Sequence, residues 1–255
     1  MKTSKLILLP VCLLSVQSLV AQESTNYGSH KRNLFKVNVT SPVLKNYSVQ
    51  YERILTKRVS VAISGRLMPA STVPFKRIIK NNINEGEDIK FVNDILNQVK
   101  VSNYAITPEL RLYVGKKGYG QGFYIAPYYR FANYELHNST ISVDDAGQNY
   151  HVLLSGKITS HTGGLQLGSQ WNLGKSVGLD LWILGPNIGE GKGSVSGISD
   201  NQLTTAEQAD LKRRLEEIDI PYIKETVTVS ANGANMSLNG LWGGVRAGLL
   251  FTFRF

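Results

Sequence analysis

Residues 245–255 read Val245-Arg-Ala-Gly-Leu-Leu-Phe-Thr-Phe-Arg-Phe255, and apolar side chains occupy every second position of this stretch. Successive side chains of a β-strand point to opposite faces. One face would therefore carry only apolar residues: Val245, Ala247, Leu249, Phe251, Phe253 and Phe255. The opposite face admits the charged residues Arg246 and Arg254. A strand with lipid on one side and a polar lumen on the other has this pattern, so the stretch predicts a transmembrane β-barrel.

The same alternation recurs along the chain, in residues 35–40, 47–55, 59–67, 106–114, 123–131, 165–173 and 177–183. Roughly nine to eleven residues let a tilted strand cross a bilayer. With residues 245–255, these stretches predict an all-β fold, an eight-stranded antiparallel transmembrane β-barrel. Pro108 and Pro127 fall inside two of the stretches. Because proline removes a ladder donor we expect a bulge at each, and the pair Gly163-Gly164 predicts another.

The connections between these stretches differ in length on the two sides of the predicted barrel. Short connections lie on one side, at residues 56–57, 115–122 and 174–175. Long connections lie on the other side, at residues 69–104, 136–152 and 190–240, where only residues 42–46 are short. Outer-membrane barrels have short periplasmic turns and longer extracellular loops. The short side is therefore predicted to face the periplasm, together with both ends of the mature chain.

Parts of the long loops have apolar residues at the spacing of helices or of a further strand. Apolar residues recur at helical intervals in residues 75–80 and 88–99. Thr204-Thr-Ala-Glu-Gln208 has the Ser/Thr-then-Glu order of a capping box and predicts a helix start. Residues 226–235 alternate again, which predicts that the last strand projects well beyond the bilayer.

The amino terminus has the order of a secretory signal. Lys2 and Lys5 precede the apolar run Leu6 to Leu14, and small residues lead to Ala21. This order predicts cleavage after Ala21 and export to the cell outer membrane. The expected organisation is a signal peptide at 1–21, a periplasmic amino-terminal arm at 22–33 and the outer-membrane β-barrel at 34–255.

Charged side chains fall on the predicted inner face of the strands. They form an expected lumen charge network: Glu52, Arg66, Glu109, Arg111, Arg130, Asp180 and Arg246. Counted from the nearest periplasmic turn, Glu52, Arg111 and Asp180 lie low, and the others lie higher. An eight-stranded barrel is just wide enough for side chains to fill it. Inward tyrosines and Trp182 consume volume as well, so we favour a plug over an anion-selective path.

Other basic residues gather at the predicted periplasmic edge. They are Lys31, Arg32, Arg53, Lys57, Arg58, Lys116, Lys117 and Lys175. Positive charge at this level would face the phospholipid headgroups of the inner leaflet. The outer loops are nearly balanced in charge and are expected to contact lipopolysaccharide. Because the excess charge lies at the membrane edge, nucleic acid is not an expected partner.

The sequence indicates no catalytic, cofactor or metal site. The four histidines have no ligand spacing, and the only cysteine, Cys12, lies in the signal peptide. His161 with Ser160 or Ser155 could form a hydrolase at the lipid interface, a hypothesis that we rank below the others. Residues 115–122 are rich in glycine but link two strands, so we interpret them as a turn rather than a phosphate site.

Several phrases point to a family. Four of them are Phe35-Lys-Val-Asn, Val49-Gln-Tyr-Glu-Arg, Pro108-Glu-Leu-Arg-Leu-Tyr and Gly163-Gly-Leu-Gln-Leu-Gly-Ser-Gln-Trp. In these the chain resembles a family of uncharacterised Gram-negative outer-membrane proteins, and in architecture it resembles the small OmpA/OmpX-type barrels. The ending, with Phe251, Phe253 and Phe255 in its aromatic positions, resembles the assembly signal that the barrel assembly machinery reads. The resemblance implies a location and a fold but no activity.

Three functional classes remain open. The first is a structural or surface-interaction barrel with a plugged lumen, whose loops at 69–104 and 190–240 contact partners. The second is a narrow channel for small polar or anionic solutes. The third is a lipid A-modifying enzyme. We favour the first and expect no enzymatic activity.

Deleting Phe255 should block membrane assembly, because the deletion removes the terminal aromatic position of the proposed signal. Cell fractionation and heat-modifiable gel migration would measure insertion. Normal insertion of the truncated chain would contradict the barrel interpretation.

Overall fold

The computed structural model describes residues 31–72, 98–145, 148–217 and 222–255. The expected signal peptide and the helical stretch expected at 75–80 lie outside these residues, as do most of the expected amino-terminal arm and most of the helical stretch expected at 88–99. The described part is mostly strand: β1 (Asn33–Asn38), β2 (Tyr47–Ile54), β3 (Val59–Thr72), β4 (Lys100–Tyr113), β5 (Gly122–Asp145), β6 (Gln148–Asn172), β7 (Val177–Ser199), β8 (Ile223–Ser230) and β9 (Gly233–Arg254).

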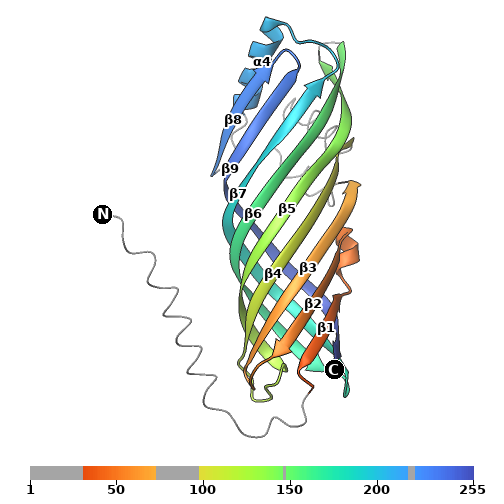
Figure 1. Cartoon of the computed structure of the whole chain (residues 1–255), viewed down its shortest axis with the longest axis vertical. Coiled ribbons are helices and arrows are strands. Elements are labelled where there is room, and N and C mark those ends of the chain that lie inside the picture. The colour runs from red at the N-terminus through yellow and green to blue at the C-terminus, as the bar shows by residue number, and fades with distance from the viewer. Residues whose placement is uncertain (1–30, 73–97, 146–147, 218–221) are drawn as a thin grey trace, which may run out of the picture.

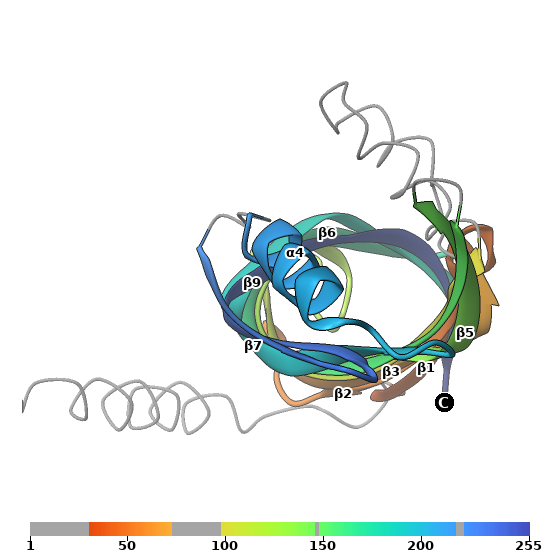
Figure 2. The same cartoon turned by 90° about the horizontal axis from the view of Figure 1, so that it is seen from above.

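Eight of these strands close into an antiparallel ring. Their order is β1-β2-β3-β4-β5-β6-β7-β9, and β1 pairs with β9 to complete it. Figure 2 shows the closed ring from above. β8 lies outside the ring and pairs with β9. The predicted eight-stranded antiparallel barrel is therefore confirmed, with one additional strand.

The two faces of the ring differ in chemistry, as the alternation predicted. β2 shows this most simply, since exposed and buried residues alternate through all of it. The outer face carries large exposed apolar residues, among them Val49, Ile63, Ile106, Ile125 and Leu165. On β4 the outer face is apolar from Tyr104 to Val114. That stretch measures roughly 34 Å along the strand, or roughly 26 Å along the barrel axis at a tilt of about 40°.

Aromatic residues border this apolar band at both ends. At the end with the short turns they are Phe35, Tyr51, Phe123, Trp171, Phe253 and Phe255. At the other end Tyr104 packs against Phe131, which meets the ring of His161 edge-on at 5.2 Å. Tyr129 and His161 also share a hydrogen bond of 2.5 Å. An apolar band between two aromatic girdles is the outer surface of a membrane-spanning barrel.

The strands continue well beyond the band on one side, which corrects the predicted loops. Most of residues 136–152 and 190–199 belongs to β5, β6 and β7 rather than to long loops. Above the band Ser, Thr and Gly occupy both faces of these strands, so the apolar alternation disappears although strand pairing continues. Figure 1 shows β5, β6, β7 and β9 rising above the ends of β2 and β3.

The upper end carries the remaining elements. Helix α4 (Thr205–Glu216) begins at the predicted capping box, in which Thr204 and Glu207 cap each other, and it packs beside β8 (Figure 1). Arg213 and Arg214 both bind Asp210, and the hydrogen bond from Arg213 lowers the pKa of this exposed carboxyl. The last strand, β9, extends well beyond the apolar band, as predicted from residues 226–235. Residues 226–230, however, belong to the separate strand β8, which turns at 231–232 into β9. On the same side, a 3₁₀ turn, η1 (Ser41–Leu44), joins β1 to β2.

The bulges do not lie where proline and glycine predicted them. The pairing register is unbroken at Pro108, Pro127 and Gly163. The two prolines interrupt only the pairing between β4 and β5. Pairs are missing next to Pro108 and Pro127, and the ladder then continues in the same register. The irregularities occur between Met68 and Ser71, Leu136 and Ser139, Leu167 and Gly168, and Trp182 and Gly185.

Two glycines of β6 make room for tyrosines inside the barrel. Gly168 pairs with Tyr124 of β5, and Gly164 pairs with Tyr128. A Cβ atom at either glycine would collide with the ring of the paired tyrosine. Tyr124 and Tyr128 are buried, so these glycines let the aromatic rings lie flat against the inner wall.

Gly168→Val should destabilise the barrel by about 1–3 kcal/mol, because the added methyl groups displace Tyr124 from a filled lumen. Urea unfolding of the refolded protein, followed by heat-modifiable gel migration, measures the change. Gly163→Val is the matched control, since a Cβ atom at Gly163 has no neighbour within 4 Å. Equal midpoints for the two variants would contradict this packing role.

Candidate functional site: the charged lumen

The lumen is closed at the end of the short turns by the β4–β5 connection. Residues 114–121 fold inward there, with left-handed backbone at Gly118, Tyr119 and Gly120. The carbonyl of Gly120 accepts a hydrogen bond of 2.7 Å from Gln170. Arg254 donates to the carbonyl of Tyr119 at 3.0 Å. The glycine-rich connection is thus a turn, as predicted, and it also forms the floor of the lumen.

An ion-pair network fills the lower lumen. Glu52 of β2 pairs through Oε2 with Lys36 of β1 and with Arg111 of β4, the latter at 3.2 Å. Its Oε1 accepts hydrogen bonds from Ser60 and from Tyr113, the second at 2.7 Å. Lys36, Glu52 and Arg111 are fully buried. Both oxygens of the Glu52 carboxylate are therefore satisfied without water.

Asp180 of β7 completes the lower network from the opposite wall. Its Oδ2 pairs with Arg111 at 2.6 Å and with Lys36 at 2.7 Å. Its Oδ1 accepts a hydrogen bond of 2.8 Å from Tyr124. Gln170 also accepts from Lys36 at 2.6 Å. Buried charges are costly unless they are paired and hydrogen-bonded, and this arrangement meets both conditions.

Glu109 links this network to a higher level. Its Oε1 pairs with Arg111 at 2.6 Å and accepts from Gln50 at 2.6 Å. Its Oε2 pairs with Arg246 of β9 at 3.0 Å. The guanidinium of Arg246 also lies over the ring of Trp182, 4.2 Å from the centroid, and over that of Tyr128 at 4.7 Å. Ion pairs, hydrogen bonds and cation–π contacts together join all eight strands of the ring across the lumen.

Arg66 and Arg130 are the two predicted lumen residues that this network does not include. Within the described residues, no carboxylate lies at ion-pair distance from either one. Arg130 is 8 % exposed, and its Nη1 donates weakly to Thr107 at 3.4 Å. The Nε of Arg66 is buried without a hydrogen-bond partner. Among the described residues, the arginines of the upper lumen therefore carry positive charge that no carboxylate pairs with at Arg66 or Arg130.

Lys36 is the principal residue that sequence reasoning missed. It has no exposed side-chain surface and pairs with two carboxylates. The cue was present, because Lys36 alternates with Phe35 and Val37 in the first predicted strand and so faces the lumen. Lys36 is therefore a member of the lumen charge network.

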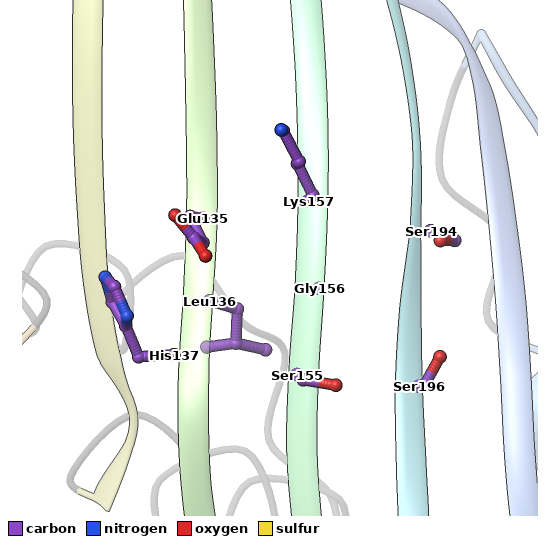
Figure 3. A pocket seen from close by; sticks show the side chains of 8 residues that line it. All are labelled: Glu135, Leu136, His137, Ser155, Gly156, Lys157, Ser194 and Ser196. Atoms are coloured by element: carbon purple, nitrogen blue, oxygen red, sulfur yellow. The ribbon is translucent and has the colours of Figure 1, made fainter.

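A second polar feature lies on the outer face, above the upper aromatic girdle. It is an open pocket of about 490 Å³ (Figure 3), lined by Glu135, Leu136, His137, Ser155, Gly156, Lys157, Ser194 and Ser196. Glu135 and Lys157 are register partners on β5 and β6, so the two residues stand directly opposite each other on neighbouring strands. Polar groups at this height suit the headgroup region of a membrane.

The histidine that contacts a serine in the structure is not the one that the sequence hypothesis named. His161 contacts Tyr129 on the outer face, whereas Ser160 is buried, so the two do not meet. His137 instead binds Ser102 at 2.8 Å. A hydrolase also needs donors for an oxyanion. The backbone around Ser102 is engaged in ladders with β3 and β5, so this contact has the character of a surface hydrogen bond.

Residues 11–189 match the model of a family described as a protein of unknown function, DUF3575. The chain belongs to the DUF3575 family. The predicted resemblance to an uncharacterised family is thereby confirmed. No curated protein matches the chain.

Two solved structures are similar to this DUF3575 chain over most of its length. They are the crystal structures of CarO and CarO2 of Acinetobacter baumannii. CarO is 14 % identical, with 86 % of this chain and 100 % of that chain covered and a TM-score of 0.32. CarO2 is 13 % identical, with 83 % and 97 % covered and the same TM-score of 0.32. The evidence for a barrel in this DUF3575 member is the pairing of β1 with β9, which closes its own sheet.

No helix among the described residues of this DUF3575 member is long and apolar enough to cross a membrane. In the same part of the chain, no cluster of three or more His, Cys, Asp or Glu side chains is arranged to hold a metal ion.

Lys36→Met should destabilise the DUF3575 barrel by about 3–5 kcal/mol, because Glu52 and Asp180 would then share Arg111 as their only cation. Adding Asp180→Asn to Lys36→Met should recover part of the loss by restoring charge balance. Urea midpoints of the refolded proteins measure both. Lys175→Met, in the exposed β6–β7 turn, is the control. A midpoint for Lys36→Met equal to that of the control would exclude a structural network.

Proposed function

We propose that this chain spans the outer membrane as a barrel with a plugged lumen and presents an interaction surface outside the cell. The observation that carries the proposal is the fully buried network of Lys36, Glu52, Arg111 and Asp180 across the lumen. A ring of eight strands has an interior that side chains fill. Water and solutes would have to displace several satisfied ion pairs to pass.

The membrane location is supported by the outer face. The apolar band between two aromatic girdles is close to the roughly 25 Å height typical of outer-membrane barrels. The basic residues of the short-turn edge lie together at one end, where Lys31 binds Ser176 of the β6–β7 turn. Positive charge at this level would attract anionic phospholipid headgroups, at about 1 kcal/mol per residue.

The interaction surface is the part of the protein above the band. The extended ends of β5, β6, β7 and β9 carry polar residues on both faces, together with β8 and the charged helix α4. The pocket near His137 and Lys157 lies above the upper aromatic girdle, and in an outer membrane this level would face lipopolysaccharide sugars and phosphates. We assign neighbouring lipopolysaccharide and an extracellular partner to this surface.

A narrow channel is the second candidate, favoured by the arginines of the upper lumen. Single-channel conductance in planar bilayers distinguishes the two candidates. The refolded wild-type protein should show no steady current. The variant Arg111→Ala/Asp180→Ala removes one cation and one carboxylate from the plug and should conduct if it folds, as judged by heat-modifiable migration.

Steady wild-type currents that Arg130→Ala changes would overturn the plug and establish the channel. Silence of a folded Arg111→Ala/Asp180→Ala variant would place the block elsewhere in the lumen and contradict the role given to this network.

A further inference from the structure

Two arginines of the upper lumen contact one pair of residues, and a third arginine lies on the same wall. Ser64 of β3 and Thr107 of β4 are register partners. Arg246 reaches across from β9 to Ser64 at 3.4 Å, and Arg130 of β5 reaches Thr107 at 3.4 Å. Arg66 lies two residues above Ser64 on the same strand and faces the same interior. Three guanidinium groups from three different strands therefore line the upper lumen.

The negative charge nearby does not balance them. Glu109 is the one described carboxylate in contact with the group, through its Oε2 to Arg246. Its other oxygen is already bound by Arg111 and Gln50. Arg66 and Arg130 have no acidic partner among the described residues. Desolvated charge without a counter-charge is costly in a low-dielectric interior, so a bound anion would stabilise this arrangement.

The wall beside Arg66 is built from small residues. Arg66 begins a register row across β3 to β6 whose other members are Ala105, Ala132 and Ser160. Above it, the rings of Tyr134 and Trp242 meet across the lumen, with centroids 5.3 Å apart. The site is thus bounded by the plug below and an aromatic pair above.

We propose that Arg66, Arg130 and Arg246 form a binding site for a small oxyanion of the phosphate or sulfate class. Guanidinium groups bind such oxygens through paired N–H donors, and the hydroxyls of Ser64 and Thr107 add further donors. The width of an eight-stranded ring admits a free anion rather than a lipid headgroup. The site shares Arg246 with the plug through Glu109, whereas Arg66 and Arg130 belong to the site alone.

Inorganic phosphate is the probe for this site. The refolded full-length mature protein is titrated in an amine-oxide detergent, which contains no phosphate, at constant ionic strength. Calorimetry and tryptophan emission record binding, because Arg246 stacks on Trp182. Trp171→Phe removes the tryptophan on the outer face and serves as the background. Wild-type protein should bind saturably and should unfold at a higher urea concentration when phosphate is present.

The variant Arg66→Gln/Arg130→Gln should lose at least tenfold in phosphate affinity and should lose the phosphate-dependent stabilisation. It should fold, because the change removes mutual repulsion. Arg66→Lys/Arg130→Lys keeps the charge and should bind with intermediate affinity. Arg213→Gln/Arg214→Gln on the exposed helix α4 is the matched control and should bind as wild type. Absence of saturable binding by folded wild-type protein, or equal affinity in Arg66→Gln/Arg130→Gln, would overturn the proposal.

Discussion

Every backbone amide of a sheet that crosses hydrocarbon needs a partner, and closure of β1 onto β9 meets this requirement. Closure with eight strands then fixes a narrow interior. Polar side chains that point inward cannot form hydrogen bonds with bulk water, so their partners must be other side chains across the lumen. The Lys36–Glu52–Arg111–Asp180 network follows from that constraint, as do the tyrosines that donate to its carboxylates.

Alternation predicted the barrel because lipid and lumen impose opposite chemistry on neighbouring residues, as in Tyr47 to Ile54. The same cue failed above the band, where both faces of β6 and β7 meet a polar environment. Bulge positions also escaped prediction, because the effect of Pro108 or Pro127 depends on which neighbour its nitrogen faces. The fit of Tyr124 against Gly168 depends on cross-strand register, which composition does not encode.

The lumen divides into two regions of different electrostatic character. Below, Glu52, Glu109 and Asp180 form ion pairs with Lys36, Arg111 and Arg246. Above, Arg66 and Arg130 leave an excess of positive charge beneath the Tyr134–Trp242 pair. The sequence predicted which residues face inward. It did not predict this division, because partner choice depends on strand heights that shear sets in three dimensions.

The seam between β1 and β9 joins the most distant parts of the described chain, yet β1 is only 6 residues long against 22 in β9. Contacts of such large sequence separation form late in folding, after the local hairpins have supplied most of the free energy. We therefore expect ring closure to be a late step of folding and the short seam to be a place where the ring opens first. Lys36 of β1 binds Asp180 of β7, and because β9 lies between these two strands in the ring, this ion pair spans the seam from inside the lumen.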